Sequence, residues 1–354
     1  MKKILFTGGG SAGHVLPNLA LMEELLSLNK ADVCYMGSDG IEKTLLAKQK
    51  IPYYQIACPK LIRSGGFSAF KQNTAIPFQL LKAVREAEKG LRIFQPDLVF
   101  SKGGYVALPV VLAADRLGIP CMSHESDFSP GLTTKLTARK CARVFTSFPE
   151  TAKRFKNGKY SGPLIRRSVF SATKAEARKY FHIKEKEKVL LVFGGGSGSQ
   201  YLNEVVRSQL KTLCETYTIL HLCGKGNEIK CNLKNYLQFE FIEDMGMAYA
   251  CADIVLSRAG AGTVFEILAM KKPSLLVPLE KQSRGDQKEN AAYFFNKGLC
   301  HVAFEGDLDD LSTLLNATLS DKELKENLLT SAFSKGNESV LRELTAFIDD
   351  VKRT

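Results

Sequence analysis

The sequence predicts an α/β protein with two Rossmann-like domains, each built on a parallel sheet. The main observation is a pattern that recurs four times: a short apolar run, a glycine-rich turn and then a helix-like segment. Strands that alternate with helices in this way form βαβ units and parallel sheets. The length of 354 residues suffices for two domains, and a charged stretch at 184–188 precedes the third unit. The apolar runs are 3–7, 97–100, 189–193 and 253–256, and the turns after them are 8–13, 103–104, 194–198 and 260–262.

Composition restricts the class of protein. Hydrophobic residues make up 45% and charged residues 24%, which is globular composition and excludes a disordered or fibrous chain. The longest apolar stretch, 107–114, is far shorter than the roughly 20 residues of a membrane-spanning helix. Only three apolar residues precede the first glycines, too few for a secretory signal. We therefore expect a soluble protein of the cytoplasm.

The cysteines and the net charge limit the kinds of site and partner that the protein can have. The nine cysteines are odd in number and contain no C-x-x-C pair, which argues against a disulfide framework and against a zinc site. The formal net charge of +12 favours an anionic partner. Nucleic acid, an anionic membrane face and phosphate-bearing small molecules all fit that charge.

The first glycine turn predicts a phosphate site. Gly8-x-Gly10-x-x-Gly13 matches the dinucleotide fingerprint, in which glycines bring the backbone close to a diphosphate at a helix N-terminus. Asp39 would then be the ribose acid of a dehydrogenase; the alternative is a tight turn that binds nothing. His14 stands at the helix start. One interpretation is that it acts as a base near neutral pH, and the alternative is that it only forms a hydrogen bond to a neighbouring carbonyl.

A second polar cluster follows the apolar run 118–122. His124, Glu125 and Asp127 are expected at the carboxyl end of a strand, where the ligands of such sheets bind. The alternative is a capping network in which Ser126 or Asp127 caps a turn. The residues alone leave both interpretations open.

The last turn, 258–266, is a second loop-to-helix phosphate site. Glu266 can accept two hydrogen bonds from ribose hydroxyls, or it only complements the helix dipole. The polar loop 283–290 suits sugar hydroxyls, or is solvated surface. Asp307-x-Asp309 is the only D-x-D, and helix capping explains it better than a metal does.

In this order the motifs resemble the MurG family, the bacterial UDP-GlcNAc:lipid I N-acetylglucosaminyltransferases of peptidoglycan synthesis. The resemblance covers nearly the whole chain. It implies a GT-B fold with an N-terminal acceptor domain, 1–162 plus a returning helix at 338–354, and a UDP-GlcNAc-binding domain at 163–337. The matching segments are 9–14 with Pro17, 102–106, 124–125 with 130–132, 161–162 with Arg166, 194–203, 241–242 with Met245, 258–260 with Glu266, and 286–287 with 290–291.

The resemblance also implies roles for individual residues. His14 would be the catalytic base, and the loop that carries it would frame the acceptor. Arg166 would contact the donor phosphates, Ile242 the uracil, Glu266 the ribose and Gln287 the GlcNAc hydroxyls. The remaining donor-binding residues would be Gly10, Ser11, Ala12, Gly13, Gly196, Ser197, Met245, Gly262 and Thr263, and the acceptor-binding residues Tyr105, His124, Glu125 and Asp127.

Four places depart from the family's commonest pattern. Ser11-Ala12 stands where Thr-Gly is usual, Ser126-Asp127 where Gln-Asn is usual, and 283–287 where Asp-His-Gln is usual. Gly196 replaces a phosphate-contacting serine, so Ser197 or the backbone would have to make that contact.

The activity implied is inverting, metal-independent transfer of GlcNAc from UDP-GlcNAc to the C4 hydroxyl of MurNAc in lipid I, without a cofactor. Arg166 and the helix N-termini after Gly198 and Gly262 would stabilise the departing UDP. The enzyme would work peripherally on the inner face of the cell membrane, beside proteins of cell-wall synthesis or division. Alternatives are a UDP-GlcNAc 2-epimerase, a dehydrogenase and a nucleic-acid binder, the last disfavoured because the basic residues are dispersed.

The segment 60–92 is the expected membrane contact. It interleaves apolar side chains with lysines and arginines, the composition of an interfacial segment. We expect Leu81 and Val84 to face the core and Phe67, Phe70 and Phe78 to be partly exposed. The alternative is an ordinary helix whose apolar face is core. The apolar set is Phe67, Phe70, Ile76, Phe78, Leu80, Leu81 and Val84, and the basic set is Arg63, Lys71, Lys82, Arg85, Lys89 and Arg92.

Overall fold

The structure is a computed structural model that describes residues 2–47, 49–60, 73–196, 198–280, 285–333 and 336–351. The chain forms two compact units. Unit 1 comprises Met1–Leu164 and Lys335–Thr354, and unit 2 comprises Ile165–Ser334. No described helix is both long enough and apolar enough to cross a membrane.

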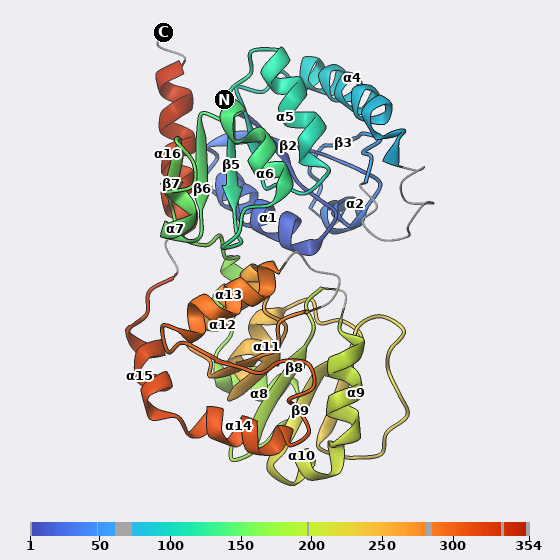
Figure 1. Cartoon of the computed structure of the whole chain (residues 1–354), viewed down its shortest axis with the longest axis vertical. Helices are drawn as coiled ribbons and strands as arrows, with labels where there is room; N and C mark the ends of the chain where they lie inside the picture. Colours follow the sequence, from blue (N-terminus) through green and yellow to red (C-terminus); the bar gives the residue numbers. More distant parts are fainter. Residues whose placement is uncertain are drawn as a thin grey trace. The chain divides into compact units, whose positions relative to one another are not determined.

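Unit 1 is a parallel sheet of seven strands in the order β3-β2-β1-β4-β5-β6-β7, covered by helices (Figure 1). All its strand pairings are parallel, as the alternation of strands and helices predicts. The strands are β1 Lys2–Thr7, β2 Ala31–Gly37, β3 Tyr53–Gln55, β4 Leu98–Ser101, β5 Cys121–Glu125, β6 Arg143–Thr146 and β7 Gly158–Tyr160. The helices are α1 Ala12–Ser27, α2 Ile41–Ala47, α4 Ile76–Phe94, α5 Ala107–Arg116, α6 Leu132–Thr137, α7 Pro149–Ala152 and α16 Gly336–Val351, with a 3-10 turn at Ala138–Lys140.

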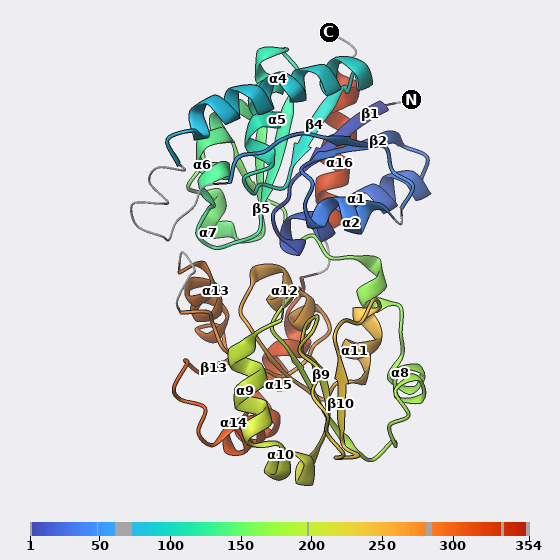
Figure 2. The ribbon, with the colours of Figure 1, turned by 90° about the vertical axis from the view of Figure 1, so that its right-hand side faces the viewer.

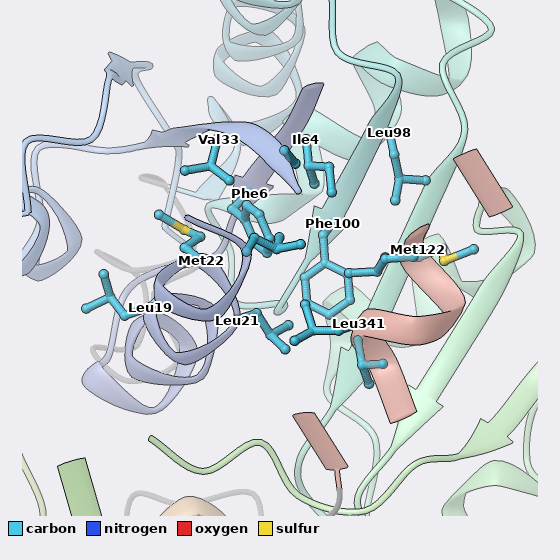
Figure 3. Close-up of a cluster of buried hydrophobic side chains, with 14 of the residues drawn as sticks. Ile4, Phe6, Leu19, Leu21, Met22, Val33, Leu98, Phe100, Met122 and Leu341 are labelled. Carbon is cyan, nitrogen blue, oxygen red and sulfur yellow. The ribbon is translucent and has the colours of Figure 1, made fainter. Parts of the chain in front are cut away.

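The two faces of this sheet bury separate cores. Successive side chains of β1 alternate between them: Ile4 and Phe6 join one cluster and Leu5 joins the other. The first cluster lies under α1 and α16, and Figure 3 shows its side chains gathered between these helices and the sheet. The second lies under α4 and α5, which Figure 2 shows on the opposite face. The C-terminal helix is therefore part of unit 1, as its buried Val340 and Leu344 require.

Unit 2 repeats the plan with six strands in the order β10-β9-β8-β11-β12-β13, again all parallel. The strands are β8 Lys188–Phe193, β9 Tyr217–Leu222, β10 Tyr236–Phe239, β11 Ile254–Ser257, β12 Ser274–Leu276 and β13 His301–Val302. The helices are α8 Lys174–Tyr180, α9 Gln200–Ser208, α10 Leu210–Thr216, α11 Met245–Cys251, α12 Ala261–Ala269, α13 Asp286–Phe295, α14 Leu311–Ser320 and α15 Lys322–Thr330, with a 3-10 turn at Arg167–Phe170. The two predicted parallel sheets are thus confirmed.

Strand order reverses once in each unit, between β1 and β4 and between β8 and β11. The chain leaves these adjacent strands in opposite directions, which opens a crevice at their carboxyl ends where ligands of such sheets bind. All four glycine turns of the sequence follow these four strands. The fold therefore places each pair of glycine turns at the ligand-binding end of its own sheet.

Local predictions failed at three places. The single helix-like segment expected after the glycine turn 194–198 is two helices, α9 and α10, which meet at Gln209. The cap of α14 is Asp310, which accepts from the amide of Thr313, so capping does not explain Asp307 and Asp309. Leu81 is 47% exposed rather than inward, whereas Val84 is buried as predicted.

The error at Leu81 has a steric cause. The buried face of α4 carries Ala83, Ala87 and Gly90, small residues that let the helix lie close to its neighbours. The large side chains of Phe78 and Leu81 consequently project from the other face, where Phe78 is 76% exposed. Phe67 and Phe70 lie outside the described residues.

Candidate functional site

The first candidate site is the pair of glycine turns at the strand-order reversal of unit 1. Gly10 has a φ of +82°, a conformation that strongly favours glycine, and a Cβ there would lie 2.5 Å from the Tyr105 ring. A Cβ at Gly104 would lie 2.2 Å from the carbonyl oxygen of Gly9. The two turns therefore pack backbone to backbone, with the half-buried Tyr105 beside them.

His14 lies in the first turn of α1, directly against both glycine turns. Its Nδ1 is 3.1 Å from the carbonyl oxygen of Gly9 and 3.0 Å from Oγ of Ser11. A carbonyl oxygen can only accept, so a hydrogen bond to Gly9 requires the proton of the neutral ring on Nδ1, where the Ser11 hydroxyl can accept from it as well. Nε2 then carries the lone pair that a general base needs. The contact with a neighbouring carbonyl, predicted as the alternative to a base, is therefore present and is compatible with a lone pair on Nε2.

His124 and Glu125 are the last two residues of β5, at the carboxyl end of a strand as predicted, and both are buried. Nε2 of His124 lies 3.1 Å from the carbonyl oxygen of Gly162, and burial lowers the pKa of this imidazole well below its usual value. Glu125 accepts from the amides of Asp127 and Gly131, at 3.1 and 2.9 Å, and from the Thr134 hydroxyl at 2.6 Å. The network is centred on Glu125, where the sequence had suggested Ser126 or Asp127 as caps.

Lys102 is a further residue of this site. In the sequence it appears only as the first residue of the matching segment 102–106. It is buried at the end of β4, and its Nζ donates to Oγ of Ser126 at 2.6 Å and to the carbonyl of His124 at 3.3 Å. Burial lowers its pKa to about 8, against the attraction of Glu125 and Asp127. The signal in the sequence was a lysine between an apolar strand and two glycines.

The second candidate site lies at the strand-order reversal of unit 2. Nη2 of Arg166 is 3.6 Å from Oε1 of Glu266, and the Tyr249 hydroxyl donates to Oε2 at 3.0 Å. Burial raises the pKa of Glu266, with Arg166 acting in the opposite direction. The arrangement is a recessed carboxylate and cation, which suits a ligand that carries hydroxyls and negative charge.

Open space adjoins this pair at the start of α12. A Cβ at Gly260 or Gly262 would meet no atom within 4 Å, so the helix N-terminus is accessible from that side. Gly262 and Thr263 are half-buried in its first turn, Met245 begins α11, and Ile242 is buried. Helix N-termini attract phosphates through their unpaired amides and partial positive charge.

A cavity of about 350 Å³ lies along the glycine loop after β8. Nη2 of Arg258 is 2.7 Å from Glu305 in its wall, and Nε of Arg258 donates to Oγ of Ser199 at 3.0 Å. Sequence reasoning missed Glu305 because it lies 47 residues beyond Arg258 and in no motif. The lining residues are Gly194, Gly198, Ser199, Gln200, Tyr201, Arg258, Leu279, Gln287 and Glu305.

Gln287 lies at this cavity, where its Oε1 accepts from the amide of Leu279 at 3.0 Å. Gly196 is exposed on the glycine loop. Ser197 and Ser283 lie outside the described residues, so the phosphate contact expected of Ser197 stays a prediction.

Comparison with known proteins agrees with this arrangement. Residues 4–146 match the glycosyltransferase family 28 N-terminal domain, and residues 189–343 match the C-terminal domain of that family. A protein of Clostridium perfringens named UDP-N-acetylglucosamine--N-acetylmuramyl-(pentapeptide) pyrophosphoryl-undecaprenol N-acetylglucosamine transferase is 44% identical over 328 residues, 91% of this chain and 90% of its own. A protein of the same name from Clostridium botulinum is 44% identical over 88% of each chain.

Solved structures show the same fold. MurG of Acinetobacter baumannii has a TM-score of 0.73 and 28% identity, covering 97% of this chain and 99% of its own. UDP-GlcNAc 2-epimerase of Neisseria meningitidis, at 15% identity and a TM-score of 0.66 over 98% and 100% of the two chains, shares the fold alone. The fold is GT-B, and the chain belongs to glycosyltransferase family 28, within the MurG family.

Proposed function

We propose that the enzyme transfers GlcNAc from UDP-GlcNAc to the C4 hydroxyl of MurNAc in lipid I, which yields lipid II for peptidoglycan synthesis. Relatives at 44% identity over about nine-tenths of the chain carry this activity in their names. In the structure, the observation that carries the proposal is the recessed Arg166–Glu266 pair beside the open N-terminus of α12. A nucleoside diphosphate offers both of the chemical groups that this site suits.

On the donor side, the ribose hydroxyls would donate to Glu266, and Arg166 would meet the diphosphate. The departing UDP gains negative charge, which Arg166 and the N-termini of α9 and α12 would stabilise as fixed positive potential. We propose that this stabilisation makes a divalent metal unnecessary. Gln287, at the cavity of the glycine loop, would hold the GlcNAc hydroxyls.

On the acceptor side, His14 would act as the base of a single displacement. Its Nε2 would take the proton of the C4 hydroxyl while that oxygen attacks the anomeric carbon and the bond from that carbon to UDP breaks. One displacement inverts the anomeric configuration. Tyr105 and Asp127, both half-buried beside the glycine turns of unit 1, remain candidates for contacting the acceptor.

We also propose that the enzyme binds the inner face of the cell membrane through the outer face of α4. The acceptor is lipid-linked, so the enzyme must reach the bilayer surface to meet it. Phe78, Leu81 and Ile93 are exposed on this helix at 76%, 47% and 69%. The same helix exposes four basic side chains, those of Lys82, Arg85, Lys89 and Arg92. Apolar insertion together with attraction to anionic headgroups is the usual basis of interfacial binding.

Incubation of the protein with UDP-GlcNAc and a lipid I analogue tests the transferase. UDP and the disaccharide product should form together, without added divalent metal and in the presence of a chelator. Formation of UDP-ManNAc from UDP-GlcNAc alone would instead indicate an epimerase. Absence of any product under all conditions would reject the proposal.

A further inference from the structure

We propose that Glu42 is a positioning residue for His14, acting through the peptide unit that joins Gly9 to Gly10. The inference rests on the proposed role of His14 as the base. The amide of Gly10 donates to Oε2 of Glu42 at 3.3 Å, while the carbonyl of the same peptide unit, that of Gly9, lies 3.1 Å from Nδ1 of His14. A peptide unit is planar, so the two contacts fix one rigid group. Glu42 and His14 therefore hold the same plane through its two opposite polar atoms.

The carboxylate of Glu42 is built into the fold beneath the glycine turn. Its residue has no exposed surface, and its Oε1 accepts from the amide and the hydroxyl of Ser38 at 2.9 and 2.5 Å. A Cβ at Gly9 would lie 2.7 Å from this carboxyl group, so the turn rests directly on it. Burying a carboxylate is costly unless hydrogen bonds compensate, and bonds from backbone amides to a charged group are strong ones. The hydrogen bonds of Glu42 therefore stabilise one conformation of the glycine turn.

That loop needs such a restraint because glycines flank the peptide on both sides. Gly9 and Gly10 have no Cβ, so this peptide can rotate with little steric resistance once Glu42 releases it. Rotation would turn the Gly9 carbonyl away from His14. The ring would then lose the acceptor that keeps its proton on Nδ1, and the Nε2–H tautomer, which is not a base at the proposed nitrogen, would become populated.

The direct test is the tautomer of His14, read from ¹⁵N chemical shifts of the imidazole nitrogens and assigned by the signals that vanish in His14→Ala. The wild-type protein should show the neutral ring protonated on Nδ1. Glu42→Gln should raise the Nε2–H fraction, because an amide cannot accept at both of its terminal positions. A wild-type ring protonated on Nε2, or a tautomer unchanged by Glu42→Gln, overturns the proposal. This readout does not depend on activity, so it fails or succeeds separately from the proposed transferase.

The kinetic test is a double-mutant cycle. Glu42→Gln should lower kcat by about 10- to 100-fold, the scale expected for a misplaced catalytic group. The affinity for UDP should stay unchanged, because the residues proposed to contact its phosphates, uracil and ribose (Arg166, Ile242 and Glu266) belong to unit 2. In a His14→Ala background the same change should cause no further loss. Losses that multiply instead would mean that Glu42 acts independently of His14.

Ser38→Ala is the matched control, since it removes the hydroxyl bond to Glu42 and retains the bond to Gly10. It should preserve both the tautomer and kcat. If circular dichroism shows that Glu42→Gln does not fold, the tautomer of the wild-type protein still decides the proposal.

Discussion

Arg166 and Glu266 lie 3.6 Å apart across unit 2, although 100 positions separate them in the sequence. Each side chain is only 16% exposed. The Tyr249 hydroxyl donates to the second oxygen of the carboxylate at 3.0 Å, and each carboxylate oxygen has lone pairs for further donors. A carboxylate held in this way can accept two ribose hydroxyls without reorganising.

Glu266→Gln should therefore raise KM for UDP-GlcNAc by about tenfold to a hundredfold. Hydrogen bonds to a charged group contribute about 1.5–3 kcal/mol, and 1.4 kcal/mol corresponds to a factor of ten. Steady-state kinetics with varied donor would measure the change. Tyr249→Phe is the control, because it removes the bond at 3.0 Å and keeps the carboxylate, so its effect should be smaller. A loss confined to kcat would contradict the ribose assignment.

His14→Ala should lower kcat by about 10²- to 10⁴-fold, the range of general base catalysis. Binding of UDP, measured by thermal stabilisation or calorimetry, should be unchanged because Arg166, Ile242 and Glu266, its proposed contacts, lie in unit 2. The pH dependence of kcat should also lose its acidic limb, since that limb reports protonation of the base. A variant that keeps the wild-type pH profile would exclude His14 as the base.

The sequence was sufficient to predict the two sheets and the position of the glycine turns at their ligand-binding ends. Apolar runs followed by glycines are local signals, whereas the strand-order reversals are seen only in the structure. The roles of Lys102, Glu42 and Glu305 were not predictable in this way. The contacts that define these roles are Lys102 with His124, Glu42 with Gly10 and Glu305 with Arg258. Their partners are 22 to 47 residues apart in the sequence, and only the packed structure brings them together. The prediction that Leu81 of α4 faces the core was wrong for a related reason. The small residues of this helix decide which of its faces is buried.

Lys102 predicts a pH dependence of stability. Burial lowers its pKa from 10.5 to about 8, so between these values the unfolded chain binds a proton that the native protein lacks. Its contribution to the free energy of unfolding must therefore rise with pH across that window. The difference in unfolding free energy between wild type and Lys102→Met should increase by roughly 3 kcal/mol from pH 7 to 10.5.

Urea unfolding at several pH values would measure this difference. Taking the difference cancels the contributions of other groups that titrate in the same range. One such group is Lys272, because burial lowers its pKa to about 8 as well. A constant difference would mean that Lys102 is hydrated or paired more strongly than its burial indicates.

The exposed apolar and basic side chains of α4 predict that the protein binds to anionic membranes. The protein should pellet with vesicles that contain anionic lipid and be released by high salt, because the attraction between basic side chains and headgroups is screened. Changing Lys82, Arg85 and Lys89 to Ala should weaken partitioning by about a hundredfold, at about 1 kcal/mol for each cation near the surface. Phe78→Ser with Leu81→Ser should weaken it in neutral vesicles as well, since the inserted apolar surface is lost.

The matched control for the apolar change is Leu329→Ser. Leu329 is 72% exposed, similar to Phe78 at 76%, but it belongs to α15 of unit 2. This variant should bind vesicles like the wild type, and every variant should bind UDP normally. Because Phe78 and Leu81 are exposed, replacing them should leave the thermal unfolding temperature unchanged. Vesicle binding that survives both sets of changes in α4 would place the membrane contact elsewhere on the protein.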